Sequence, residues 1–281
     1  MMHALEPRVH DPIFQLIEHL IPAPPEHPLG CHRPRTPNRV IFRGLLLRLV
    51  TGSSWDTIEF MMDGAVSDTT LRTRRDEWEQ AGVFQQLLVH ALAAYHRVIG
   101  IDLTKMFIDG CNNRALQGGD GTGFDPKHPG KRGWKFVIAT DAVGIPIAFS
   151  TDGANRNDYP LMFDVLDDLH TRDQLRLVGT FHADRGFSYN ETPDRLANDY
   201  GLNDFRAPSR NTRTQGRKKR SPAGPRWIVE AANSWLRNNG QIANNTDRKP
   251  EHRNAALCFA IAIILVHRIS HPKHSTWRPI R

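Results

Sequence analysis

Cysteine is scarce in this 281-residue chain, and its three copies are far apart in the sequence without a CxxC pair: Cys31, Cys111 and Cys258. This spacing excludes a disulfide framework and a zinc ribbon, and it favours a reducing, intracellular compartment. The N-terminal stretch carries no apolar signal-peptide core. The fourteen histidines include no H-E-x-x-H motif and form no Cys/His cluster, so they do not predict a zinc site.

Long apolar runs are also nearly absent. The run that stands out covers residues 255–266 (AALCFAIAIILV). Twelve helical residues rise about 18 Å, well short of the ~30 Å hydrocarbon layer, so we predict a buried core helix and no membrane partner. The Gly-rich stretch 118–133 lacks the G-x-x-x-x-G-K-[ST] order of a phosphate-binding loop, and no nucleotide cofactor is expected.

The chain does have an excess of positive charge, with 37 Lys and Arg against 30 Asp and Glu and a formal net charge of +7. Lys and Arg side chains that neutralise phosphates release condensed counterions, so this balance suits a polyanionic partner. A basic protein without such a partner would have the same composition. The charge therefore favours a nucleic acid as partner without requiring one.

The N-terminal third predicts helices only. Apolar spacing indicates helices over residues 8–21, 38–50, 55–62, 68–80 and 83–98. Ser54 and Ser67 are good N-caps, and Gly52 follows the second helix as a stop signal. Two short helices joined by a Gly-containing turn, the second with Arg72, Arg74 and Arg75 in its first half, have the form of a helix-turn-helix. A plain helical bundle with a solvated basic face would give the same pattern.

From about residue 103 the pattern changes to strands. We predict strands over 105–111, 134–141, 146–151 and 175–182 with a short one near Phe205, and helices over 158–170, 192–200 and 226–238. The first three strands can form an antiparallel meander. The fourth would join it in parallel after the helix, through a right-handed crossover. This order predicts an α/β domain that begins between residues 95 and 103.

Three acidic residues stand out by their positions. Asp109 ends the first predicted strand, Asp184 follows the fourth, and Glu230 lies inside the helix over 226–238. Carboxylates gathered at one edge of a sheet are the ligands that Mg²⁺ prefers, and two such ions ~3.5–4 Å apart can drive an in-line displacement at a phosphodiester. Taken singly, each residue has an ordinary alternative, since an Asp after a strand often caps a helix and a helical Glu is usually a surface residue.

Several blocks of sequence resemble, in order, those of a known family. They are RGLLLRLVTGSSWDTI and LRTRRDEWEQAGVFQQLL in the first third, then FIDGCNNRA, GWKFVIATDAVGIPIAFSTDGANRNDYP, FHADRGFSYN and RWIVEAANSWLRNNGQIANNTDRKPEHRNAALCFAIAI. The chain is similar over roughly residues 10–270 to the DDE transposases of bacterial insertion sequences, in the insertion-sequence-five branch of the insertion-sequence-four type.

The resemblance implies a ribonuclease-H-like mixed sheet with flanking helices, preceded by an all-helical DNA-binding region. The domains would be residues 1–100 and 101–275. The metal-binding catalytic triad would be Asp109, Asp184 and Glu230, holding two Mg²⁺ or Mn²⁺ ions. The implied enzyme cleaves double-stranded DNA at transposon inverted repeats and transfers the strand into target DNA. It would act as a homodimer or larger assembly in the bacterial cytoplasm, associated with the nucleoid.

The family's signature around the Glu is Tyr, two residues, Arg, three residues, Glu, six residues and Lys. Arg226 and Glu230 match it, Ala223 replaces the Tyr, and Arg237 replaces the Lys, which keeps the positive charge in a different geometry. We expect DNA contacts from the basic side chains near these motifs. They are Arg72, Arg74, Arg75, Lys127, Lys131, Arg132, Arg213, Arg217, Lys218, Lys219, Arg220, Arg226 and Arg237.

Two other functions are consistent with these sequence features. One is a nuclease of the same fold that hydrolyses DNA without strand transfer. The other is a decayed or domesticated transposase that only binds DNA. An intact set of three carboxylates argues against the second reading, and the formation of joined DNA products would separate a transposase from the first.

Overall fold

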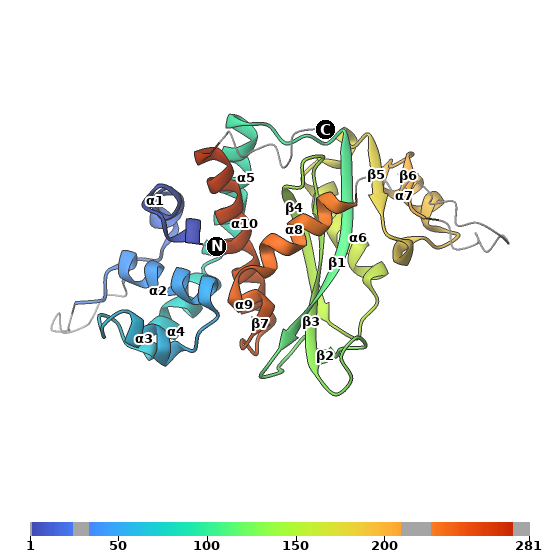
Figure 1. Cartoon of the computed structure of the whole chain (residues 1–281). Coiled ribbons are helices and arrows are strands. Elements are labelled where there is room, and N and C mark those ends of the chain that lie inside the picture. Colours follow the sequence, from blue (N-terminus) through green and yellow to red (C-terminus); the bar gives the residue numbers. More distant parts are fainter. Residues whose placement is uncertain (1, 25–33, 209–225, 272–281) are drawn as a thin grey trace. The chain divides into compact units, whose positions relative to one another are not determined.

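A computed structural model describes residues 2–24, 34–208 and 226–271 (Figure 1). The chain divides into two compact units. Unit 1 draws on Met1–Ile99 and Leu236–Ser275, and unit 2 on Gly100–Trp235. The break at residue 99 lies within the predicted boundary region. After Leu236, however, the chain joins the N-terminal helices, so the units differ from the predicted division into 1–100 and 101–275. Which unit binds DNA and which does chemistry stays a prediction.

Unit 1 is built almost entirely of helices. They are the 3-10 helices η1 (Met2–Leu5) and η2 (Glu18–Leu20) and the α-helices α1 (Pro7–Ile17), α2 (Asn38–Thr51), α3 (Trp55–Met61), α4 (Asp68–Gln80), α5 (Val83–Val98), α9 (Gly240–Ala243) and α10 (Pro250–Ser270). A two-residue strand, β7 (Asn244–Asn245), follows α9. The predicted caps are confirmed. Ser54 and Ser67 accept hydrogen bonds from the backbone N–H groups of Thr57 and Thr70, and Gly52 ends α2 with a φ of 69°.

Helix α10 is the centre of unit 1. It packs against α5 and α1, and the Phe259 ring lies 5.5 Å from that of Phe42 and 6.2 Å from that of Phe84. By length and composition alone it could cross a membrane, but 72% of its apolar window is buried inside the structure. The predicted core helix is therefore confirmed, and it extends beyond residues 255–266 at both ends.

Unit 2 contains a mixed sheet. Its strands are β1 (Lys105–Ala115), β2 (Gly123–Phe124), β3 (Arg132–Thr140), β4 (Pro146–Gly153), β5 (Thr180–Ala183) and β6 (Phe205–Arg206). Strand β3 runs antiparallel between β1 and β4 and also pairs with β2, while β5 joins β1 in parallel and β6 joins β5 in parallel. The predicted meander and parallel fourth strand are confirmed. The fold is of the expected α/β class, a mixed sheet with flanking helices.

Helices complete unit 2: α6 (Asp158–Thr171), α7 (Thr192–Tyr200) and α8 (Trp227–Arg237), with the 3-10 turns η3 (Leu175–Leu177) and η4 (Arg185–Phe187). Helix α6 packs on β3 and β4. The predicted strand over 175–182 was too long, because residues 175–177 form the turn η3 and pairing with β1 begins at Thr180. The predicted strand over 105–111 was too short, because its ladder with β3 continues to Arg114.

Candidate active site

The two aspartates of the predicted triad lie next to each other because of strand register. The parallel ladder of β1 and β5 ends with the pair Ile108 and Ala183, and Asp109 and Asp184 are the next residues on each strand. We predicted that Asp109 ends the first strand, but β1 continues to Ala115. It lies instead where β1 loses β5 as a neighbour, because the chain of β5 turns away at Asp184.

Asp184 stabilises the turn that follows β5. Its side chain accepts a hydrogen bond from the backbone N–H of Arg185 and caps the 3-10 turn η4. This is the capping role that an isolated Asp after a strand suggests. The capping carboxylate also pairs with a guanidinium, because its Oδ1 lies 2.9 Å from Arg226 Nη1. The capping and the site-forming interpretations of Asp184 are therefore compatible.

Arg226 connects Asp184 to the helix that carries the glutamate. It immediately precedes α8, and its Nη2 lies 3.9 Å from Glu230 Oε1. Helix α8 is seated against the β3–β4 turn, where a Cβ added to Gly144 would meet Ile228 Cγ2 at 3.1 Å. Glu230 keeps 58% of its side chain exposed, but it faces the guanidinium that Asp184 also binds.

A residue that sequence patterns did not single out completes the site. Asn233 of α8 donates a hydrogen bond from Nδ2 to Asp109 Oδ2, at 3.0 Å. The Asn233 side chain is buried, and its Oδ1 has no hydrogen-bond partner among the described residues. The signal that could have identified it is spacing: Arg226, Glu230 and Asn233 lie four and three residues apart and so share one helix face.

The electrostatics of Asp109 reflect this grouping. Burial raises its pKa from 3.8 to about 6. A hydrogen bond from the Gly110 backbone and the charge of Arg226 act in the opposite direction, whereas the charges of Asp184 and Glu230 raise the pKa further. All three predicted carboxylates and Arg226 thus act on one another electrostatically. The site carries three acidic groups against one guanidinium.

The residues fit a divalent cation in donor chemistry, although they do not form a ready-made cage. In the part of the chain that the structure describes, no three His, Cys, Asp or Glu side chains lie close enough together to hold a metal ion. At the site, the guanidinium of Arg226 takes the place of a cation between Asp184 and Glu230. Carboxylate oxygens are the ligands that Mg²⁺ prefers. Burial, and to a smaller extent the charges of Asp184 and Glu230, raises the pKa of Asp109, and a bound cation would favour its ionised form.

A second charged pair supports the strand beneath Asp109. Lys135 of β3 is buried, and its Nζ donates to Asp158 Oδ1 and to the carbonyl of Arg156, each at 2.6 Å. A Cβ added to Gly110 would lie only 2.7 Å from Asp158 Oδ2. The absence of a side chain at Gly110 therefore lets the Asp158 carboxylate pack directly against the backbone next to Asp109.

The predicted DNA-contacting side chains have different environments. Arg72 is exposed and pairs with Asp68. Arg74 is only 4% exposed and binds the Thr36 carbonyl and Asn38, so burial removes it from the surface where we expected it. Lys127, Lys131, Arg132 and Arg237 are exposed. The basic run Arg213, Arg217, Lys218, Lys219 and Arg220 lies outside the described residues.

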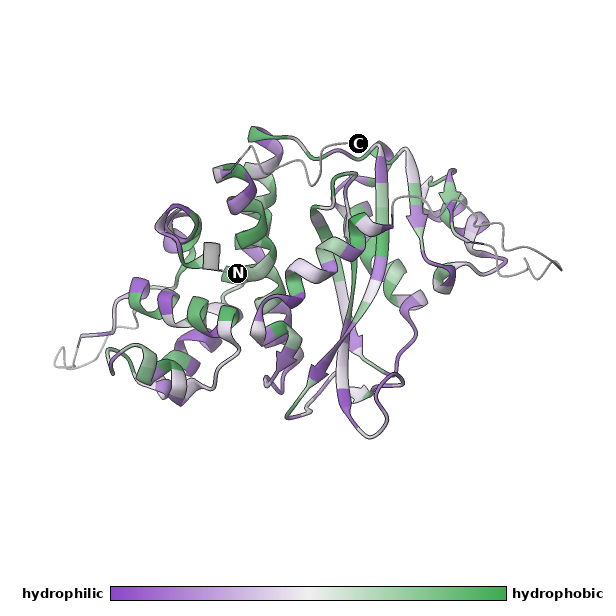
Figure 2. Cartoon of the chain, viewed as in Figure 1, coloured by the Kyte–Doolittle hydropathy of each residue, from purple (hydrophilic) through white to green (hydrophobic). Residues whose placement is uncertain are grey.

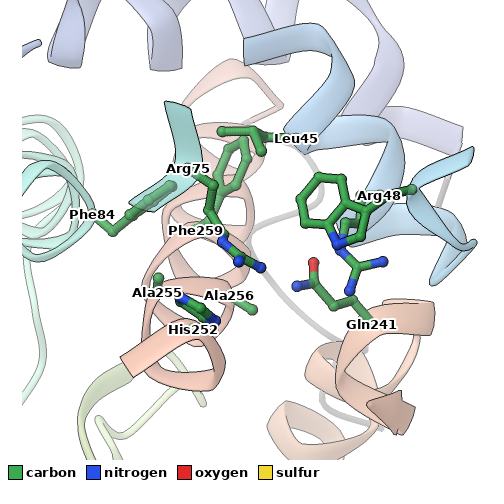
Figure 3. A pocket seen from close by; sticks show the side chains of 10 residues that line it. Leu45, Arg48, Arg75, Phe84, Gln241, His252, Ala255, Ala256 and Phe259 are labelled. Carbon is green, nitrogen blue, oxygen red and sulfur yellow. The ribbon is translucent and has the colours of Figure 1, made fainter. Parts of the chain in front are cut away.

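Arg75 is also held inside unit 1. It reaches Asp247 at 3.1 Å, and Arg48 reaches the same carboxylate at 2.9 Å. Both arginines line a small pocket with Gln241 and His252, in which the guanidinium groups of Arg48 and Arg75 point toward Gln241 (Figure 3). All residues that line this pocket belong to unit 1, and its arginines already have a carboxylate partner in Asp247. Arg75 has a structural role in holding α4 to the segment after α9.

Comparison with known proteins identifies the family of these motifs. A family model described as "Transposase DDE domain" matches residues 82–266, and one described as "Putative transposase of IS4/5 family" matches residues 9–88. The chain is 28% identical over 151 residues to the "Putative transposase for insertion sequence element IS402" of Burkholderia cepacia, covering 51% of this chain and 67% of that protein.

Two further similarities were found. The "Insertion element IS402 uncharacterized 16.2 kDa protein" of Burkholderia cepacia is 31% identical over 122 residues, which cover 43% of this chain and 82% of that protein. The solved structure of the "Mos1 transposase paired-end complex with left transposon end" aligns with a TM-score of 0.26 and 11% identity. The alignment covers 66% of this chain and 61% of that one.

Proposed function

The chain belongs to the family of transposases with a DDE domain, and we propose that Asp109, Asp184 and Glu230 are the carboxylates with which it cuts and rejoins DNA. One observation carries the assignment. Two aspartates follow the last pair of a parallel ladder, and a single guanidinium binds one of them and faces the glutamate of α8. The reaction would begin with cleavage at a transposon inverted repeat. The 3′-hydroxyl released there would then attack target DNA.

Transposases of this family generally use divalent metal ions, and we propose two ions here, Mg²⁺ or Mn²⁺. Asp109, Asp184 and Glu230 would hold them, with the remaining positions filled by water and DNA oxygens. When bound, such ions activate the attacking oxygen and stabilise the leaving oxygen of the phosphodiester. No covalent intermediate with the protein and no nucleotide cofactor is required.

The surrounding residues orient the carboxylates. Asn233 holds one oxygen of Asp109 and so orients its carboxylate. In the DNA-free protein Arg226 pairs with Asp184 and lies 3.9 Å from Glu230. When cations take up those carboxylates, its guanidinium becomes available for a phosphate, which it can bind through two parallel N–H groups. Arg226 would therefore change partners between the free and the DNA-bound protein.

The partner is double-stranded DNA, both as transposon end and as target. We propose that α3 and α4 of unit 1 contribute a helix-turn-helix, with Arg72 on the exposed face of α4. Two ends must be brought together for transposition, so we propose a homodimer or larger assembly on DNA. Such a protein would work in the bacterial cytoplasm, at the nucleoid.

Asp184→Asn tests the site. The assay uses a duplex carrying the DNA that flanks the gene, with Mg²⁺, and follows both strand cleavage and joined products. We expect Asp184→Asn and Glu230→Gln to slow cleavage by about 10²–10³-fold or more, while binding of the same duplex persists. Asp173→Asn, which changes an exposed carboxylate of the same unit, is the matched control. Unchanged cleavage in Asp184→Asn would refute the assignment, and cleavage without joined products would indicate a nuclease.

A further inference from the structure

A hairpin projects from the sheet of unit 2 between the end of β1 and the start of β3. We call residues 112–132 the basic finger. It contains four Lys or Arg, one His and two Asp. Figure 1 shows β1, β2 and β3 running to this end of the sheet, and Figure 2 shows hydrophilic residues where β1 ends and β3 begins. The finger follows directly after the site strand, because Asp109 lies on β1 only three residues before Asn112.

The finger is held in one conformation by a buried carboxylate. Asp125 accepts hydrogen bonds from Asn112 Nδ2 at 3.0 Å, from the Lys127 backbone N–H at 3.0 Å and from His128 Nδ1 at 2.7 Å. Burial raises the pKa of Asp125, but these hydrogen bonds outweigh burial and bring the pKa below its ordinary value. A charged Asp125 therefore acts as an internal anchor for the loop, and its charge is not displayed at the surface.

The cations of the finger lack counterions of their own. Arg114, Lys127, Lys131 and Arg132 are exposed, and none of them forms an ion pair with a carboxylate among the described residues. Other exposed arginines of unit 2 differ in this respect, because Arg176, Arg195 and Arg206 each pair with an Asp two to four residues away. Four exposed cations without a carboxylate partner among the described residues are thus clustered on the finger.

An exposed aromatic ring lies among these cations. Phe124 of β2 is 61% exposed, and the Arg132 guanidinium lies 5.1 Å from its ring centroid. Leu116, which follows the end of β1, is 52% exposed. Apolar side chains on a highly charged projection are removed from water only when a partner covers them, and cations around them select a partner with negative charge.

We propose that the basic finger binds a DNA duplex, with its cations on the phosphates and with Phe124 inserted into the minor groove beside Arg132. Phosphate contacts by Lys and Arg supply affinity through counterion release. An apolar wedge between base steps, flanked by Arg, is a recurrent way for proteins to distort the minor groove. The proposal rests on the proposed function, because it takes the DNA of the transposition reaction as the partner.

The charge of the finger is tested by the salt dependence of binding. The probe is the duplex carrying the DNA that flanks the gene, bound by full-length Asp184→Asn protein so that cleavage does not interfere. In the double variant Lys127→Ala/Lys131→Ala, we expect the slope of log Kd against log salt to fall by about 2, one for each phosphate that is no longer neutralised. The matched control Arg176→Ala/Arg206→Ala removes the same charge from ion-paired sites of unit 2. Equal slopes in the two doubles would overturn the proposal.

The shape of the finger is tested by Asp125→Ala. This change removes a negative charge, so a surface that attracts DNA by net charge alone would bind more tightly. The proposed finger loses its anchor, and we expect its Kd to rise by about tenfold. Circular dichroism and the thermal midpoint report whether unit 2 remains folded. Tighter binding by folded Asp125→Ala would show that the loop geometry is irrelevant.

Insertion of Phe124 between base steps is tested by fluorescence of the DNA. With 2-aminopurine placed at successive positions of the duplex, binding should raise its fluorescence at one base step, and Phe124→Ala should abolish the rise while leaving the salt slope unchanged. An unchanged fluorescence rise in Phe124→Ala would overturn the assignment of the wedge. If finger variants bind normally while the wild type cleaves and joins DNA, this proposal fails alone. If the wild type neither binds nor cleaves, the proposed function fails as well.

Discussion

Asn233 Nδ2 lies 3.0 Å from Asp109 Oδ2, a contact between a helix and a strand that are 124 residues apart in sequence. It joins the helix of Glu230 to the strand of Asp109, and it leaves the Asn233 amide oxygen buried without a partner among the described residues. A buried polar atom without a partner costs free energy, so its retention at this point suggests that the orientation of Asp109 depends on the amide.

Asn233→Ala should therefore slow DNA cleavage by about 10–100-fold, because the loss of a residue that orients a ligand has effects of that size. The divalent-ion concentration for half-maximal cleavage should rise as well, which a merely structural defect would not produce. Asn233→Asp should slow DNA cleavage more than Asn233→Ala does, since it places a second carboxylate against Asp109. Ser234→Ala, at an exposed neighbouring position, is the control. If Asn233→Ala and Ser234→Ala had the same ion dependence, Asn233 would have no orienting role.

Stability should depend on pH through the buried carboxyl group of Asp141 and the half-buried one of Asp109. Burial raises the pKa of Asp109 and of Asp141 from 3.8 to about 6. A raised folded-state pKa means that the folded protein binds the proton more tightly. The contribution of each group to the free energy of unfolding is therefore fully present below about pH 4. It is lost as the pH rises through 6, and the loss amounts to up to about 3 kcal/mol for each group.

Denaturant unfolding in EDTA at pH 4.5 and pH 7.5 tests this dependence with Asp109→Asn. The variant lacks the charge that is costly to bury, so at pH 7.5 it should exceed the wild type in free energy of unfolding. At pH 4.5, where Asp109 is mostly protonated, the difference should largely disappear. A difference of the same size at both pH values would mean that the pKa of Asp109 is not raised.

Asp247 should be indispensable for the stability of unit 1. It is buried and receives Arg48, Arg75 and the Gln241 amide, the last at 2.7 Å. Asp247→Ala would leave two largely buried guanidinium groups without their shared counterion, which we expect to cost about 3–5 kcal/mol. Chemical denaturation measures the loss, with Glu18→Ala at an exposed site of the same unit as control. Equal stability in these two variants would rule out a structural role for the ion pairs.

Gly110→Ala should displace the backbone next to Asp109, because the new side chain collides with Asp158. Its new Cβ would lie 2.7 Å from Asp158 Oδ2, and Asp158 is tied to Lys135. We expect a loss of about 1–3 kcal/mol in the free energy of unfolding, together with slower cleavage. Gly186→Ala is the control for stability, because a Cβ there meets nothing within 4 Å.

A double variant identifies the cause of that loss. In Gly110→Ala/Asp158→Ala the carboxylate that meets the new Cβ is gone. The loss in free energy of unfolding should therefore be smaller than the sum of the losses in the two single variants. Strictly additive losses would show that the close approach of Gly110 to Asp158 is not what excludes a side chain at this position.

Local signals in the sequence determined most of the secondary structure. Serine caps and a left-handed glycine act within a few residues, so the ends of α2, α3 and α4 follow from Ser54, Ser67 and Gly52. Apolar period and turn residues likewise placed α5, α6 and α7 and the strands of the meander. The resemblance of ordered motifs singled out Asp109, Asp184 and Glu230, whose combined role as ligands stays a prediction.

Only the tertiary structure decided which side chains meet. The charge of Arg74 and Arg75 suggested DNA contacts, but helix packing buries Arg74 and brings Arg75 to Asp247, 172 residues away. No local pattern assigns residues after Leu236 to the N-terminal unit, pairs Arg226 with Asp184 or directs Asn233 to Asp109. These contacts depend on strand register and on the seating of α8, and both arise only when distant segments of the chain pack together.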